Sequence, residues 1–143
     1  MYKRILLILP LFFGLQTSLF AQDMVKCNQL LEDAREAYAA GMVELVPELL
    51  LPCMESGLTG TPKIEAYKLV INAYLFDYLP DEADKLMSDF LDENPNYEGQ
   101  ASDPAEFKLL LNAHKERRAE EAATLVAAAR ARQLRGDSFV HSL

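Results

Sequence analysis

An eight-residue segment of the chain occurs twice, and the two copies begin 40 positions apart. It reads YKLVINAY at residues 67–74 and FKLLLNAH at residues 107–114, with lysine, leucine, asparagine and alanine at the same offsets. Apolar residues three and four positions apart in each copy fall on one side of an α-helix. A helix repeated at this interval indicates stacked helical units, because a single unit cannot bury its apolar side alone.

The remaining pattern predicts further helices and no strand. Gly41 is predicted to end the first helix, and Asp23 and Asp81 are predicted N-caps. We therefore expect an all-α fold in which two helical hairpins precede one long helix. Apolar spacing and the positions of glycine and proline place the helices at about 24–40, 43–54, 63–77, 81–93 and 104–134.

The first 21 residues have the pattern of a cleavable signal peptide. Two basic residues precede the apolar run ILLILPLFFGL at residues 5–15, and a cleavage point follows Ala21. The run is short and contains a proline and a glycine, which suits export better than a permanent membrane helix. We expect an exported protein, periplasmic or secreted, whose mature chain begins near Gln22.

The mature chain is long enough for one domain followed by an extension. Residues 22–102 are predicted to hold the two helix pairs. The long helix would occupy residues 103–135 as a capping or extension helix, and residues 136–143 would form a flexible tail.

Residues 67–95 carry a resemblance to the tetratricopeptide repeat (TPR) family. Two residues depart from the family pattern, because Ile71 replaces a small residue and Phe90 replaces an alanine. A weaker copy covers residues 30–58, and a third copy keeps only its first helix. The resemblance implies a short TPR-like α-solenoid, whereas the alternative left open is an unrelated five-helix bundle. The residues that carry it are Tyr67, Val70, Ile71, Tyr74, Ala83, Met87, Phe90 and Pro95.

Both cysteines of the chain fall in the first predicted hairpin. Cys27 lies 14 positions before Gly41 and Cys53 lies 12 positions after it. If Gly41 is the bend, antiparallel helices bring the two cysteines together at the open end of the hairpin. Disulfides persist in exported proteins, so we expect a bond between Cys27 and Cys53. The alternative is two buried thiols that fill packing positions.

The TPR resemblance also implies a binding face on the first helix of each pair. In that family, positions matching Lys68 and Asn72 line a concave groove, and lysine with asparagine at this spacing clamps carboxylate-bearing peptide ends. Ammonium and amide groups on rigid helices suit such a ligand. The alternative is an ordinary solvent-facing surface. The residues that the resemblance places in the groove are Arg35, Tyr38, Lys68, Asn72, Lys108, Asn112 and Lys115.

The charge of the chain is strongly acidic and unevenly distributed. The formal net charge is −8, and it becomes −10 without Lys3 and Arg4. This balance argues against nucleic-acid binding through bulk attraction. Acidic residues concentrate in the segment 77–106 and basic residues in the segment 108–135. The two segments are either solvated helix faces or include a basic C-terminal arm that docks on an acidic partner.

Sequence motifs for catalysis are missing. Neither His114 nor His141 lies near an activating group, and the chain has no Gly-rich phosphate loop, GxSxG or HExxH. Two cysteines and two distant histidines also lack the spacing of a metal site. We expect a protein that is not an enzyme and uses no cofactor, metal or small-molecule substrate.

These features predict an exported TPR-like interaction module that acts as an adaptor or scaffold. It would bind a peptide or a partner subunit, such as an outer-membrane protein, in a cell-envelope or secretion assembly. The layout of the helices, with DPAEF at residues 103–107, also resembles N-terminal helical modules of outer-membrane and secretion-system proteins of Gram-negative bacteria, where helix starts of the DP-x-EF type recur. One alternative is a structural subunit that forms homo-oligomers through the long C-terminal helix. A second alternative is a periplasmic holdase-like chaperone.

Overall fold

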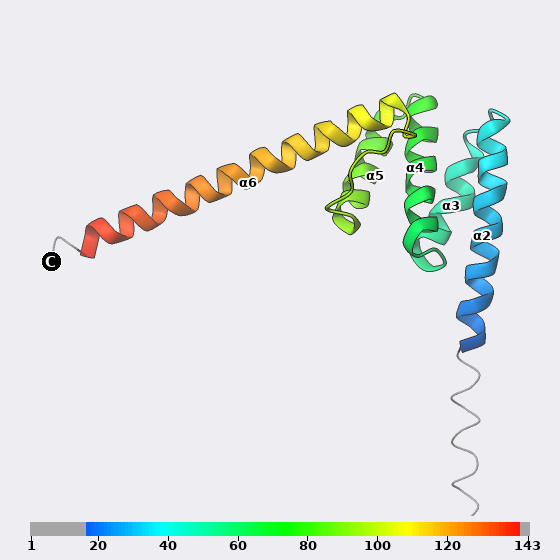
Figure 1. Ribbon diagram of the computed structural model, residues 1–143, viewed down its shortest axis with the longest axis horizontal. Helices are drawn as coiled ribbons and strands as arrows, with labels where there is room; N and C mark the ends of the chain where they lie inside the picture. Colours follow the sequence, from blue (N-terminus) through cyan, green and yellow to red (C-terminus); the bar gives the residue numbers. More distant parts are fainter. Residues whose placement is uncertain (1–16, 141–143) are drawn as a thin grey trace, which may run out of the picture. The chain divides into compact units, whose positions relative to one another are not determined.

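The protein is all-α across the residues that the structure describes, as the sequence predicted (Figure 1). The computed structural model describes residues 17–140, and it describes side chains for residues 22–135. Between residues 17 and 140 no β-strand occurs. The helices are α2 (Thr17–Ala39), α3 (Leu45–Ser56), α4 (Gly60–Phe76), α5 (Pro80–Glu93) and α6 (Ala105–Val140).

The predicted signal peptide falls mostly outside the described residues. Its apolar run at residues 5–15 is not described, and the predicted cleavage point after Ala21 lies within α2. Of the described helices, none is both long enough and apolar enough to cross a membrane.

Two compact units make up the chain, and they meet between Tyr97 and Glu98. The first unit holds α2 to α5, and the second holds α6 with the segment that leads into it. The sequence analysis placed the boundary between the helix pairs and the long helix at residue 103, whereas residues 98–102 belong to the second unit by their contacts.

Helices α2 and α3 form the first hairpin, and the turn between them depends on Gly41. The N–H of Gly41 donates to the carbonyl of Tyr38 over 3.0 Å, and the N–H of Met42 donates to the carbonyl of Ala37 over 2.9 Å. This pair of bonds is the Schellman motif, which requires a left-handed residue after the helix. Gly41 meets that requirement with φ at +80°.

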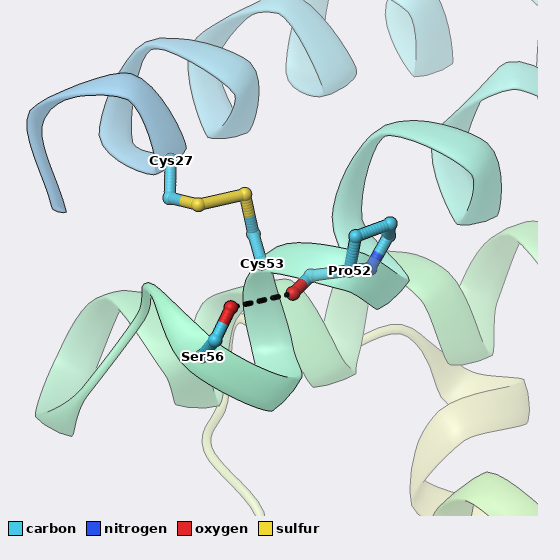
Figure 2. The surroundings of a disulfide bond; sticks show 4 residues. All are labelled: Cys27, Pro52, Cys53 and Ser56. Atoms are coloured by element: carbon cyan, nitrogen blue, oxygen red, sulfur yellow. Dashed lines mark hydrogen bonds between the residues drawn. A yellow bond between two sulfur atoms is a disulfide. The ribbon is translucent and has the colours of Figure 1, made fainter. Parts of the chain in front are cut away.

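The predicted N-cap at Asp23 is wrong, because α2 begins at Thr17 and runs through Asp23. No glycine or proline occurs between Thr17 and Gly41, so the helix has no reason to start at Asp23. Pro52 lies inside α3, which continues to Ser56. The hydroxyl of Ser56 donates to the carbonyl of Pro52 over 3.3 Å (Figure 2).

A disulfide joins Cys27 of α2 to Cys53 of α3, with the two Cα atoms 5.5 Å apart (Figure 2). Both cysteines are buried. The bond joins the two helices at the open end of the hairpin, opposite the turn at Gly41. Gly57 lies directly beside it. A Cβ added at Gly57 would overlap Sγ of Cys27 and come within 3.4 Å of the carbonyl oxygen of Asp23. The glycine therefore permits the close approach of α2 to the end of α3.

Helices α4 and α5 form the second hairpin, and its turn uses the same bonding pattern with a different residue. The N–H of Leu79 donates to the carbonyl of Tyr74 over 2.9 Å, and the N–H of Tyr78 donates to the carbonyl of Leu75 over 3.4 Å. Tyr78 takes the left-handed position with φ at +57°. In a residue with a Cβ, this conformation is less stable than the right-handed one by about 1–2 kcal/mol.

Helix α5 begins one residue before the predicted cap. Leu79 is its N-cap and Pro80 occupies the first helical turn, where the missing N–H costs nothing. Asp81 is therefore wrong as a cap. It lies with Glu82 in the first turn instead, where a carboxylate favours the positive end of the helix dipole.

The core of the first unit is built around α4. Helix α4 packs against α2, α3 and α5, whereas α3 and α5 do not come within packing distance of each other. Ala66, Val70 and Ile71 of α4 are fully buried. Phe90 of α5 is also fully buried, with its ring centroid 5.4 Å from that of Tyr67 and 4.9 Å from that of Tyr97.

Between residues 105 and 135, helix α6 is buried only near its start. Phe107, Leu111 and His114 are buried, whereas every residue from 119 to 135 is exposed. The backbone stays helical past Gly136 to Val140, although the sequence placed the end of the helix near residue 134. One glycine lowers helix propensity by only about 1 kcal/mol, which does not end a helix by itself.

The Cys27–Cys53 disulfide is predicted to stabilise the folded protein. Cys27→Ala together with Cys53→Ala should lower the free energy of unfolding by about 3 kcal/mol, because the bond no longer restricts the unfolded chain. Urea denaturation followed by circular dichroism measures this change. Reductant should destabilise the wild-type protein and leave the double variant unaffected. Equal stability of the oxidised and reduced wild-type protein would contradict the expectation.

Candidate functional site

The first unit contains a cleft of about 460 Å³ lined by residues of α3, α4 and α5. Its position follows from the packing, because α3 and α5 both pack on α4 while no Cα atom of α3 lies within 8 Å of a Cα atom of α5. The gap between them therefore has α4 as its floor. Its volume lies in the range of about 300–1,000 Å³ that is typical of ligand sites.

Apolar and aromatic side chains form much of the cleft surface. Leu51 and Met54 lie three positions apart on α3, so they share one side of that helix. Tyr67 and Tyr74 contribute their rings from α4, and Leu86 contributes from α5. Tyr74 is only half-buried, which leaves part of its ring available to a ligand.

Charged groups also line the cleft, and carboxylates outnumber ammonium groups. The carboxylates belong to Glu55, Glu82, Asp89 and Glu93, and the ammonium groups belong to Lys63 and Lys85. The Nζ atom of Lys63 lies 2.8 Å from Oε2 of Glu93 and 5.9 Å from the ring centroid of Tyr67. Since Lys63 is paired in this way, the cleft presents net negative charge to a ligand.

One polar network fixes the wall of the cleft at Glu93. The hydroxyl of Tyr67 donates to Oε1 of Glu93 over 2.8 Å, and Lys63 donates to the same oxygen over 2.9 Å. The hydrogen bond from Lys63 holds the pKa of Glu93 below its ordinary value, against the opposing effect of burial. Burial raises the pKa of Tyr67, and its hydrogen bond to Glu93 acts in the same direction.

Tyr74 remains a neutral phenol in its environment. Burial raises its pKa, and the nearby carboxylate of Glu82 adds to the rise. A tyrosine hydroxyl in this state both donates and accepts hydrogen bonds, so it can recognise either a carbonyl or an N–H group.

The side chains that line the cleft are of a few chemical kinds. Its lining consists of leucine, methionine, tyrosine, lysine, aspartate and glutamate. Among the residues whose side chains are described, no group of three His, Cys, Asp or Glu is arranged to hold a metal ion. Apolar contact, aromatic rings and charge are therefore the interactions that these residues offer to a ligand.

The residues that the TPR resemblance placed in a groove lie elsewhere, and none of them lines the cleft. Those on the first unit belong to the first helix of each hairpin, whereas the cleft opens on the side of the second helices. The first unit carries Arg35, Tyr38, Lys68 and Asn72, and the second unit carries Lys108, Asn112 and Lys115.

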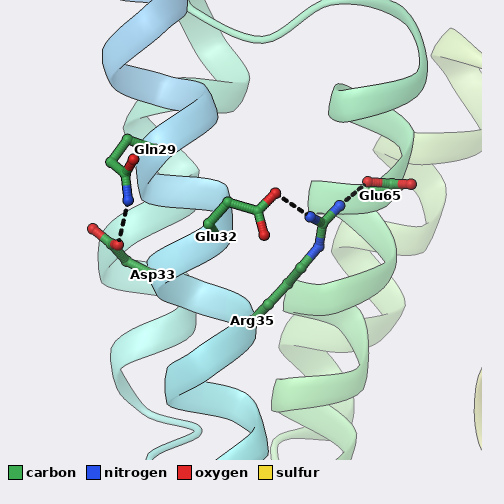
Figure 3. A network of polar contacts seen from close by, with 5 residues as sticks. All are labelled: Gln29, Glu32, Asp33, Arg35 and Glu65. Carbon is green, nitrogen blue, oxygen red and sulfur yellow. Dashed lines mark hydrogen bonds and ion pairs between the residues drawn. The ribbon is translucent and has the colours of Figure 1, made fainter.

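Several of these predicted residues already have partners within the protein. Arg35 forms ion pairs with Glu32 and with Glu65 of α4, beside the Gln29–Asp33 hydrogen bond of 3.0 Å (Figure 3). The hydrogen bond to Glu32 raises the pKa of Arg35.

Asn72, which was predicted to line the groove with Lys68, also has a hydrogen-bond partner within the protein. Asn72 is buried, and its Nδ2 donates to the carbonyl oxygen of Lys68 over 2.7 Å. On the second unit, Nζ of Lys115 donates to Oε1 of Glu98 over 2.9 Å. The carboxylate-binding groove stays a prediction, and a ligand there would compete with the glutamates that pair with Arg35 and Lys115.

Sequence reasoning missed the cleft because its residues look like ordinary core positions. Tyr67 and Tyr74 belong to the apolar side of α4. Leu51 and Met54 fit the apolar pattern of α3, and Leu86 fits that of α5. The one available signal was the pair of tyrosines, since a buried hydroxyl needs a hydrogen-bond partner. That signal does not say which helices border the rings.

The fold and the cleft define a class, namely an all-α protein of stacked helical hairpins with one disulfide and a cleft of about 460 Å³. No protein-family model, no curated protein and no solved structure matches the chain. The TPR resemblance therefore stays a prediction that rests on the residues quoted above.

The Glu93 network predicts a specific dependence of stability on pH. A carboxyl group whose pKa is lowered by folding stabilises the protein above its unfolded pKa of about 4.3, and this contribution disappears as the pH falls through the lower folded pKa. At neutral pH, Glu93→Gln should therefore be less stable than the wild-type protein by at most about 1 kcal/mol. The effect is small because the Glu93 side chain is 45% exposed.

Urea denaturation at several pH values tests this expectation. The difference between wild-type protein and Glu93→Gln should shrink as the pH falls below about 4.3 and through the lower folded pKa of Glu93. Glu48→Gln is the control, because Glu48 is an exposed carboxyl group of α3 outside the cleft. A Glu93→Gln difference that stays constant with pH would show that the ion pair is not responsible.

Proposed function

We propose that the protein is an exported interaction module that binds a segment of another protein in the cleft between α3 and α5. It would serve as an adaptor or scaffold in a cell-envelope or secretion assembly. The observation that carries the proposal is a cleft with an aromatic floor and a rim in which four carboxylates outnumber two ammonium groups.

The lining indicates the chemistry of the bound segment. Leu51 and Tyr74, both half-buried, offer apolar surface to one large apolar side chain of the ligand. Carboxylates such as Glu82 and Asp89 favour a lysine or arginine next to that anchor, and an arginine can also stack on a tyrosine ring. We therefore expect a ligand segment in which an apolar anchor has basic neighbours.

Export is supported by the state of the cysteines. Cys27 and Cys53 lie at disulfide distance, and such bonds persist in oxidising compartments such as the periplasm. The proposed place of action is therefore the periplasm or the extracellular medium, where the partner would also be found.

The cleft and the TPR-derived groove make opposite demands on a ligand. The cleft favours positive charge beside an apolar anchor, whereas the groove containing Lys68 and Asn72 would favour a carboxylate. A ligand selected without prior assumption about its sequence therefore distinguishes the two surfaces.

Selection of peptides from a random library on the purified protein provides the test. The enriched peptides should combine one large apolar residue with adjacent lysine or arginine. Leu51→Lys places a positive charge on the cleft wall and should weaken binding of these peptides at least about tenfold. Leu49→Lys is the matched control, since Leu49 is a half-buried leucine of the same helix outside the cleft.

The results separate the alternatives. Peptides enriched in acidic residues or free carboxyl ends would favour the groove of Lys68 and Asn72 over the cleft. Binding that tolerates Leu51→Lys as well as it tolerates Leu49→Lys would overturn the assignment to the cleft.

A further inference from the structure

Exposed apolar side chains gather at one end of the first unit. They come from the α2–α3 turn and the α4–α5 turn, and the most exposed are Phe76 at 63% and Tyr78 at 91%. We call this surface the turn patch. Its members are Met42, Leu45, Phe76, Tyr78 and Leu79.

The two turns that supply the turn patch are neighbours in space. They lie at the same end of the stacked hairpins (Figure 1). Val43 and Glu44 from the first turn line a hollow of about 170 Å³ together with Asp77 and Leu79 from the second. The two turns therefore border the same hollow, although they are more than thirty positions apart in the sequence.

Tyr78 gives the patch a feature that packing within the first unit does not explain. It holds a left-handed backbone conformation in the same hydrogen-bonding motif that Gly41 completes in the other turn. Glycine adopts this conformation without strain, whereas tyrosine does not. The strain is not recovered by burial, since the ring is almost completely exposed. A strained and exposed aromatic residue is typical of a contact surface.

The surroundings of the turn patch are acidic. Asp77 precedes Tyr78 directly, Glu44 lies in the first turn, and Asp81 and Glu82 begin α5. All four side chains belong to exposed residues. A partner that covers the patch must therefore combine apolar surface with positive charge.

The distal half of α6 has that combination. Val126, Arg130 and Leu134 are four positions apart, so they lie along one face of the helix. Val126 is 68% exposed and Leu134 is 63% exposed. This face offers two apolar side chains with an arginine between them.

We propose that the face of Val126, Arg130 and Leu134 on one copy of the protein docks on the turn patch of a second copy. Val126 and Leu134 would cover the apolar side chains of the patch. Arg130 would lie among its carboxylates and against the ring of Tyr78, since a guanidinium group both pairs with carboxylates and stacks on aromatic rings. The inference does not rest on the proposed function, because no member of the turn patch lines the cleft, although Glu82 borders both surfaces.

Sedimentation velocity of the purified protein over a range of concentrations tests the proposal. The average mass should rise with protein concentration, and salt should weaken the association because it screens the charges. Tyr78→Gly should raise the dissociation constant at least about tenfold. The same substitution should raise the melting temperature, because it relieves the backbone strain. A loss of association therefore cannot be attributed to misfolding.

Charge exchange identifies the helix that docks. Arg130→Glu should also weaken association about tenfold or more, and adding Asp77→Arg to the same chain should restore it. An arginine at position 77 suits the end of α4, because cations favour the negative end of a helix dipole. Arg132→Glu is the matched control, because Arg132 lies on another face of α6 and should leave the association unchanged.

Three results would overturn the proposal. The first is a wild-type protein that stays monomeric at all concentrations, which includes the case in which α6 docks within its own chain. The second is association that survives Tyr78→Gly. The third is association that is abolished by Leu51→Lys and not by Arg130→Glu, which would assign it to the cleft. Failure of peptide binding in the cleft would leave the proposal untouched.

Discussion

Burial of α4 on three sides is the interaction on which the first unit depends. Ala66, Val70 and Ile71 are fully buried because α2, α3 and α5 all pack against this helix. The small side chain of Ala66 allows close approach, and the β-branched residues fill the space that remains. Since α3 and α5 both pack on α4 and their backbones stay more than 8 Å apart, the arrangement that buries α4 also leaves the cleft between them.

The two hairpins reach the same geometry with different means. The first closes its turn with Gly41 and its open end with the Cys27–Cys53 disulfide. The second has no disulfide and places Tyr78 in the left-handed position of its turn. Its open end is held by the Tyr67, Lys63 and Glu93 network and by the aromatic contacts of Phe90. The covalent bond and the buried aromatic cluster thus serve comparable roles at equivalent places.

Much of the fold could be predicted, because helices and turns depend on nearby residues. The hairpins and the Cys27–Cys53 pair followed from apolar spacing and from Gly41 as the bend. The predicted helix starts were wrong, because α2 runs through Asp23 and because Leu79 caps α5 in place of Asp81. The candidate site could not be predicted in this way, since Leu51, Tyr74 and Leu86 come together only when α3 and α5 flank α4.

The amino-acid sequence by itself determined the helical class, the number of hairpins and the pairing of the cysteines, because these follow from short-range periodicity and the limits of backbone conformation. Only the tertiary structure decided which polar groups are available. It paired Arg35 with Glu65 and buried Asn72, and it exposed Tyr78 in a strained turn. The physical reason is that the burial and partners of a side chain depend on neighbouring helices, whose positions local sequence does not specify.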